Sequence, residues 1–171
     1  MNERWCVRCN SAGPTPLLRS NVKLLLGNRV SSAADLAVLD LGCGNGRNTR
    51  YIRSLGCTNT VAFDMAGDVG HPLTLGKRPL PLFKASVDVV LANYVLMFLN
   101  AKELTQTLRD IQRVARPDCR IIVELYPAKD SFAPTPDAVS KLLHEISWRL
   151  DWHVLRYRDH SESYSMIAAK P

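Results

Sequence analysis

Short, mainly apolar runs recur along this chain, and turn-forming or polar residues lie between them. Runs of about four to eight apolar residues are typical of strands that are buried on both faces of a sheet. On this pattern we expect strands at residues 36–41, 58–64, 87–93 and 120–125. A further antiparallel pair is predicted near the end of the chain, at residues 154–158 and 163–169.

Apolar residues at helical spacing fill most of the intervals between these runs. The i, i+3, i+4 pattern predicts helices at residues 17–27, 47–55, 101–115 and 136–150. Pro136 stands at the start of the last one, where proline is well tolerated. Strands that alternate with helices indicate an α/β fold, in which a mostly parallel sheet is covered on both faces.

Residues 65–85 interrupt this alternation. The stretch contains six glycines and prolines, which disfavour a long helix. They are Gly67, Gly70, Pro72, Gly76, Pro79 and Pro81. We therefore expect only a short strand here, at residues 73–75 or 80–83, and a reduced third-strand edge of the sheet.

The composition is that of an ordinary globular protein. With 171 residues, 46% hydrophobic and 22% charged, the chain suits a single domain over residues 1–171. No run reaches the roughly 18 apolar residues of a membrane span, and residues 1–10 lack an apolar signal core. We therefore expect a cytoplasmic protein without membrane contact, whose five cysteines are free thiols. The net charge of +6 would attract an anionic partner without selecting one.

Metal binding is not expected. Cys6 and Cys9 form a single C-x-x-C pair, whereas a tetrahedral zinc site needs four ligands. The other three cysteines stand alone, and no pair of histidines has ligand spacing.

The strongest local signal is a glycine-rich loop between the first predicted strand and the helix that follows it. Gly42, Gly44 and Gly46 alternate there, so the backbone can turn tightly and a ligand can approach it closely. A phosphate-binding P-loop is excluded, because Arg47 and Asn48 replace the required Lys-Ser/Thr. The dinucleotide pattern G-x-G-x-x-G fits poorly, because the third glycine comes one position early.

An adenosine-type ligand without a phosphate at the loop remains the third alternative. Asp64 ends the second predicted strand, 24 residues after Asp40. A carboxylate at that place can accept hydrogen bonds from both hydroxyls of a ribose. In an open α/β sheet, ligands bind at this carboxyl edge of the strands.

At this point the segments resemble the class I S-adenosylmethionine-dependent methyltransferases, over roughly residues 36–169. VLDLGCGNGRNT is similar to the first motif of that family, and VAFDM to its acidic second motif. DVVLANYVLMFL resembles the fourth-strand segment, and IQRVARP with RIIVEL resembles the helix, turn and fifth strand. GNGRN together with NYVLMFL is most similar to the tellurite-resistance methyltransferase branch. The resemblance implies a Rossmann-like methyltransferase fold, with an antiparallel last strand, and S-adenosyl-L-methionine as cofactor.

The resemblance also assigns residues to the cofactor site. The glycine loop would pack beneath the methionine part, Asp40 would order this loop, and Asp64 would hold the ribose. Met65 would lie against the adenine, and Asp68 is a candidate for a further adenine contact. The expected cofactor-binding residues are Asp40, Gly42, Cys43, Gly44, Gly46, Arg47, Asn48, Asp64, Met65, Asp68, Asn93 and Tyr94.

Three residues near strand ends are candidates for catalysis: Tyr94, Glu124 and His160. The resemblance implies that Asn93 and Tyr94 face the sulfonium and the substrate. Glu124 follows three apolar residues, and a carboxylate so deep in a strand should be paired or lie at a site. Each candidate also has a structural interpretation, such as a packing tyrosine or a solvated hairpin histidine. A general base is needed only if the acceptor arrives protonated.

We expect methyl transfer to a small-molecule acceptor, with residues 1–30 covering the active site and Trp5 and Arg8 as candidates for a lid. Two alternatives stay open. A nucleic-acid methyltransferase would use the net positive charge and the basic stripe of Arg47, Arg50 and Arg53. The fourth-strand segment lacks the prolines of DNA amino-methyltransferases, which counts against DNA. A non-catalytic cofactor-binding protein would explain the reduced sheet edge.

Overall fold

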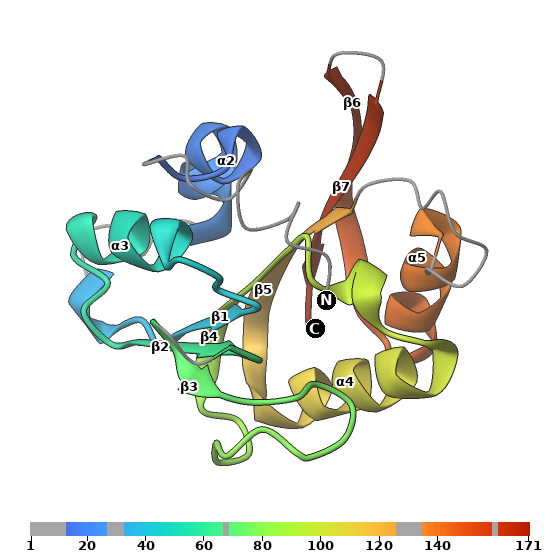
Figure 1. Ribbon diagram of the computed structural model, residues 1–171, viewed down its shortest axis with the longest axis horizontal. Coiled ribbons are helices and arrows are strands. Elements are labelled where there is room, and N and C mark those ends of the chain that lie inside the picture. Colours follow the sequence, from blue (N-terminus) through green and yellow to red (C-terminus); the bar gives the residue numbers. More distant parts are fainter. Residues whose placement is uncertain (1–12, 27–32, 67–68, 126–134, 159–160) are drawn as a thin grey trace.

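The computed structural model describes residues 13–26, 33–66, 69–125, 135–158 and 161–171, and within these ranges it contains one seven-stranded sheet (Figure 1). The strand order is β3-β2-β1-β4-β5-β7-β6. Neighbouring strands from β3 to β5 are parallel, whereas β7 is antiparallel to both β5 and β6. The strands are Val38–Leu41 (β1), Thr60–Asp64 (β2), His71–Pro72 (β3), Val87–Asn93 (β4), Ala115–Leu125 (β5), Arg149–Arg158 (β6) and Ser161–Ala169 (β7).

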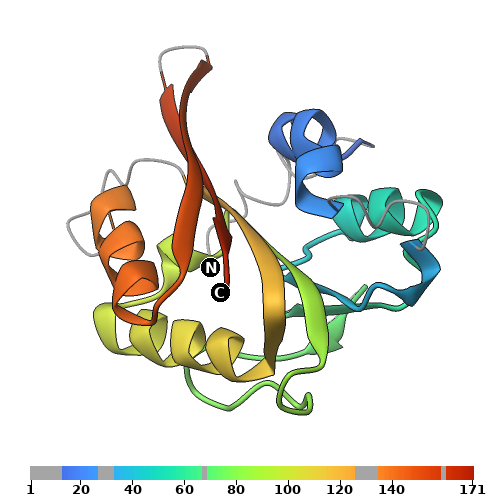
Figure 2. The ribbon, with the colours of Figure 1, turned by 180° about the vertical axis from the view of Figure 1, so that it is seen from behind.

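Helices cover both faces of this sheet. Seen from opposite sides, α2 and α3 lie over one face, and α4 and α5 over the other (Figures 1 and 2). Side chains mark where helices begin: Asn100 forms a capping box with Glu103 at α4, and Thr135 caps α5. The helices are Pro16–Leu26 (α2), Arg47–Ser54 (α3), Ala101–Val114 (α4) and Pro136–Glu145 (α5), with a short 3₁₀ turn at Leu96–Phe98 (η2).

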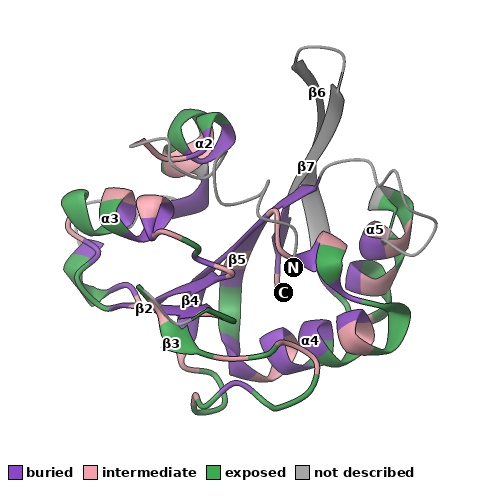
Figure 3. Cartoon of the chain, viewed as in Figure 1, coloured by how far each residue is buried: buried purple, intermediate pink, exposed green. Residues whose placement is uncertain are grey.

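Alternate residues of the central strands face opposite helices. Val38 of β1 and Ile122 of β5 belong to the apolar cluster beneath α2 and α3. Leu39, Val90 and Ile121 belong to the cluster beneath α4 and α5. The central strands are therefore buried on both faces (Figure 3). Burial of each such side chain stabilises the fold by about 1.5–3 kcal/mol, which anchors the strand ends that carry the polar residues described below.

The third strand is shorter than predicted and lies elsewhere. β3 consists of His71 and Pro72, which pair with Phe63 and Asp64 of β2, so the predicted strand at residues 73–75 or 80–83 was wrong. The strand lies at His71 and Pro72 because these are the residues that pair with Phe63 and Asp64 of β2. The chain leaves the sheet after them. The reduced third-strand edge is confirmed, and residues 69–76 contain no helix.

Several other boundaries differ from the prediction, three of them by five residues, and β6 is one of these because it begins at Arg149 rather than at residue 154. α5 ends at Glu145 rather than at residue 150, because Ser147 has a left-handed φ of 64° and breaks the helix before β6. β5 begins at Ala115, five residues before the predicted strand, because Ala115 already pairs with Val87 of β4.

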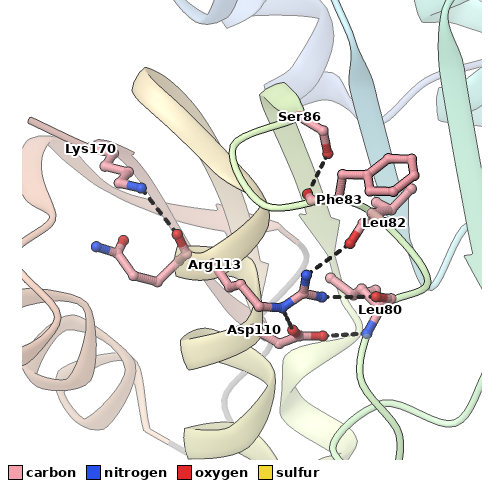
Figure 4. A network of polar contacts seen from close by, with 8 residues as sticks. Leu80, Leu82, Phe83, Ser86, Asp110, Arg113 and Lys170 are labelled. Atoms are coloured by element: carbon pink, nitrogen blue, oxygen red, sulfur yellow. Dashed lines mark hydrogen bonds and ion pairs between the residues drawn. The ribbon is translucent and has the colours of Figure 1, made fainter.

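Polar side chains of α4 hold the irregular segment that precedes β4 (Figure 4). The Arg113 guanidinium donates to the carbonyls of Leu80 and Leu82, both at 2.8 Å, and to Asp110 Oδ1 at 2.6 Å. The second Asp110 oxygen accepts from the Leu80 N–H. Because this segment makes few sheet contacts, its backbone groups need these partners. Phe83, at its tip, is 87% exposed.

Candidate active site

Three buried polar residues lie near the carboxyl ends of adjacent strands and on the same face of the sheet. They are Asp40 of β1, Asn93 of β4 and Glu124 of β5, with 1%, 8% and 2% of their surfaces exposed. Side chains alternate along a strand, so each shares the α2/α3 face with the apolar residue two positions earlier. Asn93 and Glu124 are direct register partners. The sequence predicted each of these residues as part of a site, and the fold brings them to one edge.

The glycine loop follows β1 at this edge. Gly42, Gly44 and Gly46 have left-handed φ angles of 65°, 53° and 75°. A side chain at Gly42 would collide with Val95, and one at Gly46 with Val69. At Gly44 a side chain would meet nothing within 4 Å. The loop is thus closely packed against other side chains at Gly42 and Gly46, and it is open at Gly44, the middle glycine.

Asp64 lies beside this open glycine. Its Oδ2 accepts from the Gly44 N–H at 2.9 Å, and its Oδ1 accepts from the Ala66 N–H at 3.0 Å. The carboxylate therefore orders the glycine loop as well as its own turn, which differs from the isolated cleft group that the ribose role suggests. The neighbouring Met65 is 53% exposed.

Asp40 connects the end of β1 to the start of α3. Its Oδ2 accepts from the Thr49 hydroxyl at 2.5 Å. Burial raises the pKa of Asp40 from 3.8 to about 6, although the hydrogen bonds from Thr49 oppose this rise. The nearby Asp64 charge raises this pKa further, and Arg47 lowers it. A positive charge placed near this carboxyl would favour its ionised form.

A second polar chain runs from α3 through the start of α2 to β4 and β5. Asn48 Oδ1 accepts from the Thr15 N–H at 3.0 Å, and Asn93 Nδ2 approaches Thr15 Oγ1 at 3.5 Å. Asn93 Nδ2 also donates to Glu124 Oε2. Asn93 Oδ1 is buried and has no hydrogen-bond partner among the described residues.

The structure places the remaining predicted residues less centrally. Cys43 is buried, and burial above all raises the pKa of its thiol to about 12, so the thiol stays protonated. Tyr94 is half-buried with a left-handed φ of 57°, a strained value for a non-glycine residue, and its N–H donates to the Glu124 carbonyl at 2.8 Å. Asp68 and His160 lie outside the described residues, as do Trp5 and Arg8.

Two arginines of the basic stripe are engaged with the protein backbone. Arg50 donates to the Asn45 carbonyl at 2.6 Å, and Arg53 donates to the Thr60 carbonyl at 2.8 Å. These contacts tie α3 to the glycine loop and to β2. They give both guanidinium groups a structural role.

Sequence reasoning missed Thr15 as a member of the site. Its side chain caps α2, because Thr15 Oγ1 accepts from the Leu18 N–H at 3.3 Å. The Thr-Pro pair at positions 15 and 16 is a recognisable helix start, but nothing local indicates that Thr15 also reaches Asn93. Thr49, the partner of Asp40, carried no signal either.

The described residues limit two other kinds of site. In these ranges, no group of three or more His, Cys, Asp or Glu side chains is placed to hold a metal ion. None of the described helices combines the length and apolar character needed to cross a bilayer.

Comparison with known proteins shows which family this arrangement belongs to. A family model described as "Methyltransferase domain" matches residues 15–167. A probable S-adenosyl-L-methionine-dependent methyltransferase TehB of Haemophilus influenzae is 25% identical over an alignment of 156 residues, and the match covers 81% of this chain. The chain spans about half the length of the curated relatives it matches, 54% in each case.

Two solved methyltransferase structures have the same fold. One is the 1,6-didemethyltoxoflavin-N1-methyltransferase of Burkholderia thailandensis, bound to 1,6-didemethyltoxoflavin and S-adenosylhomocysteine. It superposes with a TM-score of 0.67 at 19% sequence identity, and the match covers 91% of this chain and 78% of that chain. The other is the N-methyltransferase NodS of Bradyrhizobium japonicum WM9 in complex with S-adenosyl-L-homocysteine, with a TM-score of 0.68, 14% identity, and 98% and 97% covered. The chain therefore belongs to the methyltransferase domain family, and it is similar to TehB.

Proposed function

We propose that this chain transfers a methyl group from S-adenosylmethionine to a small-molecule acceptor. The observation that carries the proposal is the open backbone at Gly44, flanked by the Asp64 carboxylate at the carboxyl edge of the sheet. The proposal takes residues 1–171 as one domain and residues 1–30 as a cover of the site. It places the activity in the cytoplasm, in keeping with the free thiols of Cys43, Cys57 and Cys119.

The residues present fit this cofactor. Gly44 leaves room for a ligand against the backbone, as a bulky methionine moiety requires. Asp64 offers carboxylate oxygens to the ribose hydroxyls, and the exposed Met65 offers an apolar surface to the adenine. Asp40 lies beneath the loop with a pKa near 6, so a cationic cofactor would favour its ionised form. The proposed set also includes Arg47, Asn48 and Asp68.

The chain has a modest chemical task in such a reaction. When bound, S-adenosylmethionine supplies a methyl group already activated by the positively charged sulfur. The protein must hold the acceptor in line with that methyl group and exclude water. Tyr94 and Glu124 stand at the ends of β4 and β5, where an acceptor beside the loop would lie, and His160 remains a proposed third member.

A small molecule is the favoured acceptor for two reasons. The fold neighbours include an enzyme crystallised with 1,6-didemethyltoxoflavin. In addition, Arg50 and Arg53 donate to backbone carbonyls, which leaves less of the basic stripe for phosphate contacts. We therefore favour a small acceptor over nucleic acid, although the net charge of +6 alone is compatible with both.

Titration calorimetry with S-adenosylmethionine and S-adenosylhomocysteine tests the cofactor assignment directly, and both should bind. Gly44→Val should abolish or strongly weaken binding, because its side chain would occupy the open space. Gly56→Val is the matched control: Gly56 is also left-handed, at φ 97°, and its nearest neighbour is at an ordinary 3.5 Å, but it lies at the other end of α3. Both variants should lose stability, by roughly 2 kcal/mol, and only the first should lose affinity.

Three outcomes would change the proposal. Failure of the wild-type chain to bind either compound would contradict the cofactor assignment. Salt-sensitive binding to RNA or DNA, with methyl transfer to it, would replace the small acceptor by nucleic acid. Binding without turnover across a broad panel of small acceptors would indicate a non-catalytic cofactor-binding protein.

A further inference from the structure

Asp40 and Thr49 form a buried hydrogen-bonded pair that joins β1 to α3. The exposed fractions of the two residues are 1% and 2%, and the Thr49 hydroxyl donates to Asp40 Oδ2 at 2.5 Å. The backbone N–H of Thr49 also donates to this carboxyl. Asp40 therefore receives two hydrogen bonds from one residue, and both bonds favour its ionised form.

The start of α3 explains why Thr49 has this partner. Thr49 is the third residue of the helix, where a backbone N–H has no acceptor within the helix itself. Gly46, the residue before the helix, has no side chain that could accept from it. Asp40 supplies the missing acceptor from the neighbouring strand, and a negative charge is favourable at the start of a helix.

The strand neighbours of Asp40 offer its carboxyl no hydrogen bond from a side chain. Its register partners on β2 and β4 are Ala62 and Leu91, whose side chains are apolar. The orientation of the carboxyl between these strands and α3 therefore depends on Thr49.

The charged and titratable groups that face Asp40 do not replace Thr49. Burial raises the pKa of Asp40 to about 6, the hydrogen bonds from Thr49 oppose this rise most, and the charges of Asp64 and Arg47 have smaller, opposite effects. The Cys43 thiol in the glycine loop has a pKa of about 12 and stays protonated. Thr49 is thus the main group that keeps the buried Asp40 ionised near neutral pH.

From this geometry we infer that Thr49 is a positioning residue of the cofactor site, which acts through Asp40. It holds the Asp40 carboxylate in a fixed orientation and in its charged form beneath the glycine loop, where the cationic S-adenosylmethionine would bind. The inference rests on the proposed function and deepens it, because it names the residue that adapts the site to a positively charged ligand.

The role of Thr49 depends on pH in a definite direction. Below the pKa of Asp40 a bound cation must displace a proton, whereas above this pKa it meets a carboxylate that is already charged. Loss of a hydrogen bond to the charged form changes an ionisation constant by about a factor of ten. Without the Thr49 hydroxyl the pKa of Asp40 rises, so cofactor binding becomes weaker at a higher pH than in the wild type.

Calorimetric titration with S-adenosylmethionine at pH 6 and pH 8 tests the inference. Thr49→Val keeps the shape of the side chain and removes the hydroxyl, so its affinity should be about fivefold below wild type at pH 6 and within about twofold at pH 8. Thr49→Ser retains the hydroxyl and should match the wild type at both values. An equal loss of affinity at both pH values would make Thr49 purely structural, and an unchanged affinity at pH 6 would also contradict the inference.

Thr60→Val is the matched control. Thr60 is 5% exposed, and its hydroxyl donates at 2.6 Å to the Cys57 carbonyl rather than to a carboxyl. The variant should lose stability with no pH-dependent change in affinity. If it showed the same pH-dependent loss as Thr49→Val, the effect would not come through Asp40, and the inference would be wrong.

Proton release on binding is a second measurement, and it needs no variant of Thr49. At pH 6 about half of the Asp40 side chains hold a proton, so the wild-type chain should release about half a proton when S-adenosylmethionine binds. Calorimetry in two buffers of different ionisation enthalpy measures this release, and Asp40→Asn should abolish it. No release from the wild type, or an equal release from Asp40→Asn, would overturn the inference.

The two proposals can fail separately. If the wild-type chain does not bind S-adenosylmethionine, the proposed function fails, and the cofactor role of Thr49 fails with it. Carbon-13 NMR titration of the Asp40 carboxyl in the free chain still decides whether Thr49 controls its charge. Thr49→Val should raise the titration midpoint by about one pH unit, and Thr49→Ser should leave it in place. A midpoint that Thr49→Val does not move would refute the inference even if the cofactor binds.

Discussion

Two networks of polar side chains, one beneath α2 and one on α4, differ in how completely their groups are paired. On α4, both oxygens of Asp110 accept hydrogen bonds, and the Arg113 guanidinium donates to Asp110 and to two carbonyls. Beneath α2, Asn93 keeps a buried oxygen without a partner among the described residues. A completed network fixes a segment of backbone, whereas an incomplete one at a strand edge leaves a group available to a ligand.

The two networks also differ in their expected effect on stability. The α4 network takes the place of regular structure for the segment before β4, so its removal should weaken the fold. The network beneath α2 lies on the same face as Asp40, a separate carboxyl whose ionisation is unfavourable in the buried position. That region therefore costs stability at neutral pH, as functional sites commonly do. Three experiments test this contrast.

The largest effect is expected for Arg113→Leu. Removing this guanidinium leaves Asp110, which is 8% exposed, without its ion pair and deprives two carbonyls of donors. Because Arg113 itself is 36% exposed, we expect a loss of about 3 kcal/mol in the free energy of unfolding rather than more. Urea denaturation measures the loss, and Arg109→Leu, an exposed arginine of the same helix, is the control. Affinity for S-adenosylhomocysteine should stay within twofold, and a loss below about 1 kcal/mol would remove the contrast between the networks.

Asp40→Asn should raise the free energy of unfolding, whereas Arg113→Leu lowers it, and the size of the gain should depend on pH. The folded chain holds the Asp40 proton up to about pH 6, whereas the unfolded chain releases it near 3.8. Wild-type stability from this group is therefore present below pH 3.8 and is lost as the pH rises to about 6, by roughly 3 kcal/mol at about 1.4 kcal/mol per pKa unit. Asp40→Asn has no such titration, so its stability relative to wild type should rise between pH 4 and 6.5 and then level.

Urea denaturation of both proteins at four pH values across this window measures that difference. Groups distant from Asp40 titrate alike in the two proteins, so the difference reports Asp40 together with its coupling to Asp64 and Arg47. A difference that does not change with pH would show that the Asp40 carboxyl is not destabilised by its burial.

Asp64→Ala is expected to have the smallest effect on stability and a clear one on binding. It removes hydrogen bonds to the N–H groups of Gly44 and Ala66, both exposed and able to contact water, so the fold should lose about 1 kcal/mol. Loss of the contacts to a ribose should lower the affinity for S-adenosylhomocysteine at least tenfold. Calorimetry measures the loss of affinity and thermal melts measure the loss of stability, with the exposed Asp35→Ala as the control. A large fall in melting temperature with affinity within twofold would make Asp64 purely structural.

The sequence by itself determined the order of the central strands and helices and the place of the glycine loop. β4 coincides with the predicted strand at residues 87–93, because a short, mainly apolar run is typical of a strand buried on both faces. The left-handed glycines, the acid that ends β2 and the buried polar residues Asp40, Asn93 and Glu124 were also predictable. Their signals are local, since each lies in or directly after an apolar run.

The tertiary structure decided what depends on partners distant in the sequence. β3 forms at His71 and Pro72, because the register with β2 selects those residues. The later apolar residues do not form it, because Asp110 and Arg113, about thirty positions away, hold their backbone groups. The contact between Thr15 and Asn93 joins residues 78 positions apart. No local pattern encodes such contacts, because they arise only when the helices pack across the sheet.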